Sequence, residues 1–149
     1  MKNLYNKQDI TDMVQRLENL TMDSKCLWGT MRVDQMLVHL NLSFEPALGL
    51  SFPKRKFISR ILGTTLKRVY LDKEEMIKNA RTIDSYVATG EYDFEKVRRE
   101  AIENLKLFYS NGPEKCSSHP HPYFGKLTPE EWATLKWRHF DHHLRQFGV

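Results

Sequence analysis

Four stretches of this chain repeat apolar residues at the i, i+3, i+4, i+7 spacing that places them on one face of an α-helix. They lie at about 10–20, 33–48, 94–110 and 128–147, and no stretch of useful length alternates apolar and polar residues as a β-strand would. Amphipathic helices bury their apolar faces most simply against one another. The sequence therefore predicts an all-α fold, a four-helix bundle with additional segments in its connections.

Local signals mark where some of these helices begin and end. Thr128 is a typical N-cap, Pro129 suits the first helical position, and Glu131 completes a capping box. The third helix is expected to end at 111–113, since glycine favours the left-handed conformation and proline cannot continue a helix. Pro46 is expected to kink or end the second helix.

Two long connections separate the helices. The insertion between the second and third helices runs from about 51 to 90, and its apolar residues predict one or two short helices lying across the bundle. The connection at 112–127 is rich in proline and leads directly into the fourth helix. Long connections in compact domains are often functional, so both are candidates to border a site.

The bulk composition is that of a soluble globular protein. The 149 residues fit one domain spanning 1–149, with 40% hydrophobic and 28% charged residues and a net charge of +4. No apolar run approaches the ~20 residues that span a bilayer, and the beginning lacks the apolar stretch of a secretory signal. Cys26 and Cys116 are too few for a disulfide framework and are expected to be inert thiols. We expect a cytoplasmic protein without membrane contact.

Three histidines lie close together in the fourth helix. His139 and His143 are four residues apart and share one helical face, whereas His142 lies about 80° to the side. His39 on the second helix offers a third imidazole, and three neutral imidazoles make a metal shell of the catalytic type. The alternative is a core histidine at 39 and a solvated, basic helix end at 139–143. An HxxxH spacing alone is too weak a motif to choose between them.

Several segments resemble the DinB/YfiT-like superfamily, in its branch of small bacterial proteins. They are Trp28-Gly-Thr-Met31, Gln35-Met-Leu-Val-His39-Leu and, most specifically, His121-Pro-Tyr-Phe-Gly-Lys-Leu-Thr-Pro-Glu-Glu-Trp132 with His139-Phe-Asp-His-His143-Leu-Arg-Gln146-Phe-Gly. The resemblance covers essentially the whole chain in helix order and spacing. One departure is Arg32, where a Ser, Thr, Asn or Asp cap of the second helix would be expected.

The resemblance implies a divalent metal ion held by one histidine of the second helix and an HxxxH pair of the fourth. At those positions stand His39, His139 and His143. Zinc or nickel is expected first, with iron or manganese as alternatives. His142 is expected off the metal face. His121 could cover the site or simply lie in an anchored loop, and Gln146 is a candidate partner of a metal-bound imidazole.

The function that the resemblance implies is that of a metal-dependent enzyme that activates a thiol or water. It would be a transferase that uses a low-molecular-weight thiol such as bacillithiol or mycothiol, or a hydrolase, with a small-molecule substrate; relatives are often dimeric, which suggests a homodimer. No acid–base residue is identified, because Asp141 lies on the wrong face and Glu45 is only one candidate. A non-catalytic, stress-related binding module with a structural metal or none is the alternative.

A basic stretch in the insertion is the other candidate functional surface. It contains Lys54, Arg55, Lys56, Arg60, Lys67 and Arg68. Such a stretch can bind anions or nucleic acid. The neighbouring aromatic residues lack the spacing of a base-stacking platform, so we expect a solvated face and no nucleic-acid partner.

Overall fold

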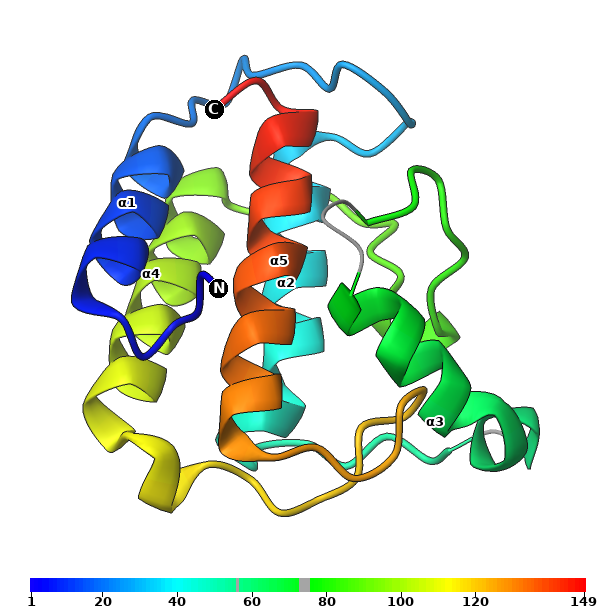
Figure 1. Cartoon of the computed structure of the whole chain (residues 1–149). Coiled ribbons are helices and arrows are strands. Elements are labelled where there is room, and N and C mark those ends of the chain that lie inside the picture. The colour runs from blue at the N-terminus through cyan, green and yellow to red at the C-terminus, as the bar shows by residue number, and fades with distance from the viewer. Residues whose placement is uncertain (56, 73–75) are drawn as a thin grey trace.

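The chain folds as an all-helical bundle. The computed structural model describes residues 1–55, 57–72 and 76–149 (Figure 1). The bundle consists of α1 (Lys7–Glu18), α2 (Val33–Leu48), α4 (Phe94–Asn111) and α5 (Pro129–Gln146). An isolated antiparallel bridge between His121 and Gly125 is the only β-type pairing among the described residues. The predicted all-α four-helix bundle is confirmed.

The four helices pack in two pairs. α1 lies beside α4, and α5 lies in front of α2 in the view of Figure 1. α2 packs against both α4 and α5, and α1 packs against the same two helices. α3 (Phe57–Asp72) lies outside this group and contacts α5 (Figure 1). One side of α5 therefore faces the insertion rather than the bundle core.

The insertion contains one longer helix instead of the one or two short helices expected from the sequence. α3 runs for 16 residues and is followed by a short 3₁₀ turn, η1 (Asp84–Tyr86), which packs against α2. A second 3₁₀ turn, η2 (Pro113–Lys115), follows α4. Lys56 and the side chain of Arg60, both part of the basic stretch, lie outside the described residues.

The predicted start of α5 is confirmed in detail. Thr128 Oγ1 accepts a hydrogen bond from Glu131 N at 3.2 Å, and Glu131 Oε2 accepts one from Thr128 N at 2.8 Å. At α2, Gln35 Oε1 accepts from the backbone N–H of Arg32 at 3.1 Å, but Arg32 has no acceptor atom for the return bond. The arginine side chain instead pairs with Asp34 at 2.6 Å.

The sequence left open whether Pro46 would kink or end the second helix, and the structure shows that it does not end α2. The helix continues to Leu48 and stops at Gly49, which adopts the left-handed conformation with φ 72°. Proline removes one backbone donor, and near a helix end few hydrogen bonds remain to be lost. Gly49 can take the positive φ without a steric penalty and therefore decides the end of the helix.

Aromatic residues form the centre of the bundle core. The ring of Phe44 on α2 lies 5.4 Å from those of Phe108 on α4 and Phe140 on α5.

Outside the core, Arg16 of α1 pairs with Asp141 of α5 at 2.7 Å and donates to the carbonyl of Val149 at 2.9 Å. Within the part of the chain that the structure describes, no helix is both long and apolar enough to cross a bilayer.

Two leucines of α4 test this packing directly. Leu105 is fully buried, whereas 45% of Leu107 is exposed. We expect Leu105→Ala to lower the free energy of unfolding by about 2–5 kcal/mol, because it removes buried methyl groups and leaves a cavity. Leu107→Ala should change it by no more than about 0.5 kcal/mol. Urea denaturation followed by circular dichroism measures both, and equal losses would contradict the helix orientation.

Candidate metal centre

Three imidazoles from two helices meet at the side of the bundle that faces the insertion. His39 comes from α2, and His139 and His143 come from successive turns of α5. The Nε2 atom of His139 lies 3.1 Å from Nε2 of His39 and 3.2 Å from Nε2 of His143. One ligand atom of each residue lies within 4.8 Å of the others. These three residues could hold a metal ion, and they are the three that the sequence indicated.

The other ring nitrogen of His39 and of His139 has a hydrogen-bond acceptor. His39 Nδ1 lies 2.9 Å from the carbonyl oxygen of Tyr86, which can only accept. His139 Nδ1 lies 3.1 Å from Ser43 Oγ. The Ser43 hydroxyl also lies 2.9 Å from the carbonyl of Leu40, which can only accept, so it can donate there and accept from the imidazole. His39 therefore carries its proton on Nδ1, and the same tautomer of His139 satisfies Ser43 and Leu40 together.

The third ring is oriented in the same way. His143 Nδ1 lies 2.8 Å from Gln146 Oε1. The amide group of Gln146 donates through Nε2 to the carbonyl of Trp28 at 2.7 Å, which fixes its oxygen toward the histidine. Gln146 thus has the orienting role that the sequence suggested, and His143 also carries its proton on Nδ1.

This proton arrangement leaves three Nε2 lone pairs directed toward one another. A hydrogen bond between two of these atoms would need a proton on Nε2, which neutral rings with Nδ1–H do not have. Lone pairs that converge at 3.1–3.2 Å repel each other unless a cation lies between them. Imidazole nitrogens oriented by an outer hydrogen bond are the usual ligands of transition metals, so the donor set fits a divalent ion.

Burial keeps the imidazoles neutral. Loss of solvent lowers the pKa of His39, His139 and His143 below the ordinary histidine value, and that of His143 falls to about 3. Mutual repulsion within the cluster lowers the pKa of His139 and His143 further. Neutral rings at physiological pH can donate a lone pair without first losing a proton. The solvated, basic helix end that was the alternative interpretation is not what the structure shows.

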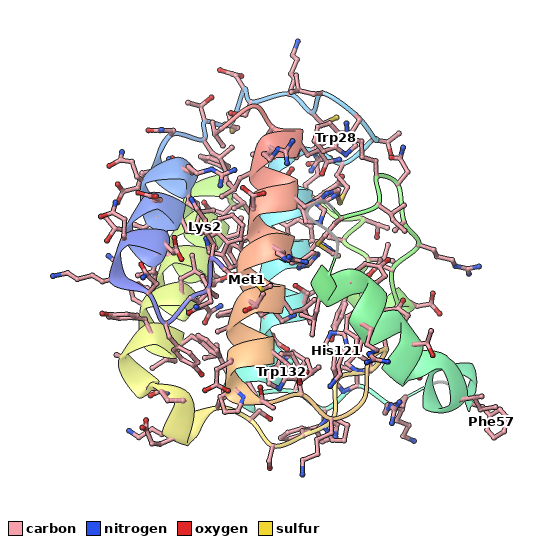
Figure 2. All side chains as sticks on the ribbon, in the orientation of Figure 1. Met1, Lys2, Trp28, Phe57, His121 and Trp132 are labelled. Atoms are coloured by element: carbon pink, nitrogen blue, oxygen red, sulfur yellow. The ribbon has the colours of Figure 1, made fainter. Side chains whose placement is uncertain are left out.

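The imidazoles open onto a cavity of about 530 Å³. It lies between α5, the insertion and the loop before α5. Figure 2 shows Trp28 near the C-terminal end of α5 and His121 toward its N-terminal end. Its apolar walls include Trp28, Met31, Tyr70, Val87, Phe124 and Leu135. Pockets of this size and character bind small molecules.

The other histidines divide between the cavity and its surroundings. His121 is buried and lines the cavity, and its Nδ1 accepts from the backbone N–H groups of Tyr123 at 3.2 Å and Phe124 at 3.3 Å. His142 also lines the cavity, with its ring 5.7 Å from that of Trp28, but it is not one of the three converging residues. His119 lies elsewhere, 4.8 Å from the ring of Phe52.

Neither candidate acid–base residue lines the cavity. Asp141, which the sequence placed on the wrong face of the helix, lies outside the cavity wall and is paired with Arg16. Glu45 is half-buried on α2 but also lies outside the cavity wall.

Sequence reasoning missed Lys136, a buried residue of α5 that does line the cavity. Its signal was available, because Lys136, His139 and His143 follow the i, i+3, i+7 spacing of one helical face.

The basic stretch of the insertion is partly engaged in structural contacts. Arg55 Nη2 donates to the carbonyl of Ser59 at 2.6 Å. Lys67 pairs with Glu131 of the α5 capping box at 2.8 Å. The Lys67 pair attaches α3 to the start of α5, and Ser59 Oγ attaches it to the preceding loop by donating to the carbonyl of Pro122 at 2.8 Å.

Comparison with known proteins identifies a family but no characterised relative. Searches of curated proteins and of solved structures gave no match. A family model described as "Protein of unknown function (DUF1569)" matches residues 3–148, nearly the whole chain. The chain therefore belongs to the DUF1569 family.

Proposed function

We propose that His39, His139 and His143 hold a divalent metal ion and that the protein is a metal-dependent enzyme acting on a small molecule. The observation that carries this proposal is the convergence of three Nε2 lone pairs whose Nδ1 protons are all engaged by acceptors. The segments that resemble the DinB/YfiT-like superfamily support the same three ligands. We propose zinc or nickel as the ion, with iron or manganese as alternatives.

An open coordination shell favours catalysis over a purely structural role. Structural zinc sites usually have four protein ligands, whereas catalytic sites have three and leave a position for water or substrate. The cluster contains three ligating residues among those the structure describes, and it adjoins a cavity large enough for a small molecule. A non-catalytic binding module remains the competing proposal, and turnover measurements separate the two.

A divalent ion at this position supplies Lewis acidity that makes water or a thiol nucleophilic near neutral pH. The protein residues provide orientation and apolar contact area. Ser43, the carbonyl of Tyr86 and Gln146 hold the imidazole rings, and the cavity beside them has largely apolar walls. We propose a thiol-dependent transferase or a hydrolase, since both reactions need an activated nucleophile beside a bound electrophile.

Metal analysis tests the ligand assignment. Untagged protein should contain about one divalent ion per chain by inductively coupled plasma mass spectrometry. His39→Ala, His139→Ala and His143→Ala should each reduce this content strongly, because two imidazoles bind far more weakly than three. His119→Ala is the matched control, since His119 lies outside the cavity. Stoichiometric metal that survives all three ligand substitutions would refute the assignment.

Turnover tests the enzymatic part of the proposal. Metal-loaded protein should accelerate at least one of two reactions. The first is the attack of glutathione, cysteine or bacillithiol on 1-chloro-2,4-dinitrobenzene with release of chloride, and the second is the hydrolysis of p-nitrophenyl acetate. The rate should fall to background in His39→Ala and persist in His119→Ala. Inactivity with every thiol and with the ester, in protein of full metal content, would favour the binding module.

The hydrogen bond that orients His143 can be tested by a substitution that changes neither His143 nor Gln146. Gly29 has φ 80°, and an added Cβ would lie 2.8 Å from Gln146 Nε2, so Gly29→Ala should displace the amide that orients His143. We expect zinc affinity to fall about 10-fold to 100-fold, the usual cost of losing such a partner.

Gly49→Ala is the control for that experiment. Gly49 has a similar φ of 72°, but an added Cβ meets no atom of the described residues within 4 Å. Both substitutions should cost about 1–2 kcal/mol of stability through backbone strain. Competition with a chromophoric chelator measures zinc affinity, and equal affinities in the two variants would argue against the role of Gln146.

A further inference from the structure

Lys136 is a buried cation with very few partners. Only 2% of the residue is exposed, and it lies on α5 one turn before His139 on the same helical face. Its Nζ donates a hydrogen bond to the carbonyl oxygen of Ser43 and lies 5.5 Å from the ring centroid of Trp132. An ammonium group can donate three, and no carboxylate of the described residues pairs with it. Burying an ammonium group without a counterion is costly, so its position needs an explanation.

His121 places a second donor in the same cavity. Its Nδ1 accepts two backbone N–H bonds, so the neutral ring carries its proton on Nε2. Nothing in the described parts of the chain accepts a hydrogen bond from this Nε2–H, although the residue is 95% buried. The ring is held in place by stacking against Phe124 at 4.6 Å. The donor is thus oriented and unused.

The cavity around these donors is positive and largely apolar. Its charged residues are Lys136 and Arg81, and no aspartate or glutamate of the described residues lines it. Burial lowers the pKa of His39, His139 and His121, and the nearby charge of Lys136 lowers the pKa of each of them further. Both donors also lie against the ring of Trp132, with the His121 ring centroid at 5.2 Å and Lys136 Nζ at 5.5 Å from its centroid.

Burial also destabilises the charged form of Lys136, whose pKa falls to about 7. An anion in the cavity would reverse this effect by pairing with the ammonium group. The apolar wall residues would contact the remainder of such a ligand. The combination is typical of sites for small amphipathic molecules, in which a few polar groups fix orientation and apolar walls provide contact area.

We infer that the cavity binds a small organic anion, such as a carboxylate, with its charged end on Lys136 Nζ and His121 Nε2 and its apolar body against the aromatic walls. The inference rests on the proposed function in one respect, since it names this anion as the substrate class of the metal centre. Lys136 and His121 are then binding residues, and the position of Lys136 on the His139 face brings the bound molecule toward the ligand cluster.

Three probes of one shape and different charge test this site: benzoate, benzamide and benzylamine, titrated into the protein as purified and followed by ligand-observed NMR. Benzoate should bind at least about tenfold more tightly than benzamide, the effect of one charge-assisted hydrogen bond, and benzylamine should bind most weakly. Similar affinities for the three probes, or no benzoate binding at millimolar concentration, would overturn the inference. This comparison needs no variant and is independent of folding defects.

Variants assign the preference to Lys136. Lys136→Met and Lys136→Gln should each remove the benzoate preference and leave benzamide binding unchanged, with thermal melting confirming that they are folded. Lys126→Met is the control, because Lys126 is exposed and lies outside the cavity. An undiminished benzoate preference in both Lys136 variants would overturn the assignment.

Metal content separates this inference from the proposed function. The titrations are repeated after dialysis against a chelator, with the metal measured in each sample. A benzoate preference that depends on Lys136 in metal-free protein supports the anion site whatever the outcome for the metal. A preference that disappears with the metal, or that never depended on Lys136, would place the anion on the metal and overturn the inference while leaving the metal centre intact.

Discussion

The contact between α2 and α5 at Ser43 is the interaction on which the candidate site depends. Ser43 Oγ accepts from His139 Nδ1, and the Ser43 carbonyl accepts from Lys136 Nζ. The two donors lie one turn apart on α5, so the pair of bonds sets the position of one helix along the other. A slide of one turn, about 5.4 Å, would separate His39 from the two imidazoles of α5. The histidine cluster, the buried lysine and the cavity wall all depend on this alignment.

The site is costly for the fold. It contains three desolvated imidazoles with facing lone pairs and a lysine that pairs with no carboxylate of the described residues, features that a sequence selected only for stability would avoid. The bundle can carry this cost because its apolar centre lies on the other side of α5, where Phe44 packs against Phe108 and Phe140. Separation of the two regions lets one helix contribute a core face and a polar face that is shielded by the insertion.

Helical periodicity predicted the bundle and placed His139 and His143 on one face, because both depend on spacing within regular elements, whereas the resemblance to a known superfamily joined His39 to that pair. A separation of four residues places His139 and His143 on one face in any straight helix. His39 meets them because its helix packs against theirs. Ser43 could have been noticed as a polar residue one turn after His39 in an apolar stripe. The carbonyls of Tyr86 and Trp28 could not, because every residue has one and only the path of the connections brings these two to the imidazoles. The predicted range of 33–48 for α2 is confirmed, and Gly49 rather than Pro46 ends the helix.

By itself, the sequence determined the helices, their capped ends and which histidines share a face, because these follow from bonds and contacts between residues close in the chain. Only the tertiary structure decided the proton positions on the three rings, the enclosure of the cavity by the insertion and the loop before α5, and the burial of Lys136 and His121 within it. These depend on contacts such as those of Trp28 with Gln146 and of Ser43 with Lys136, whose partners are far apart in the sequence and leave no periodic pattern. The shared face of His139 and His143 is thus a property of local spacing, and their convergence with His39 beside the cavity is a property of the fold.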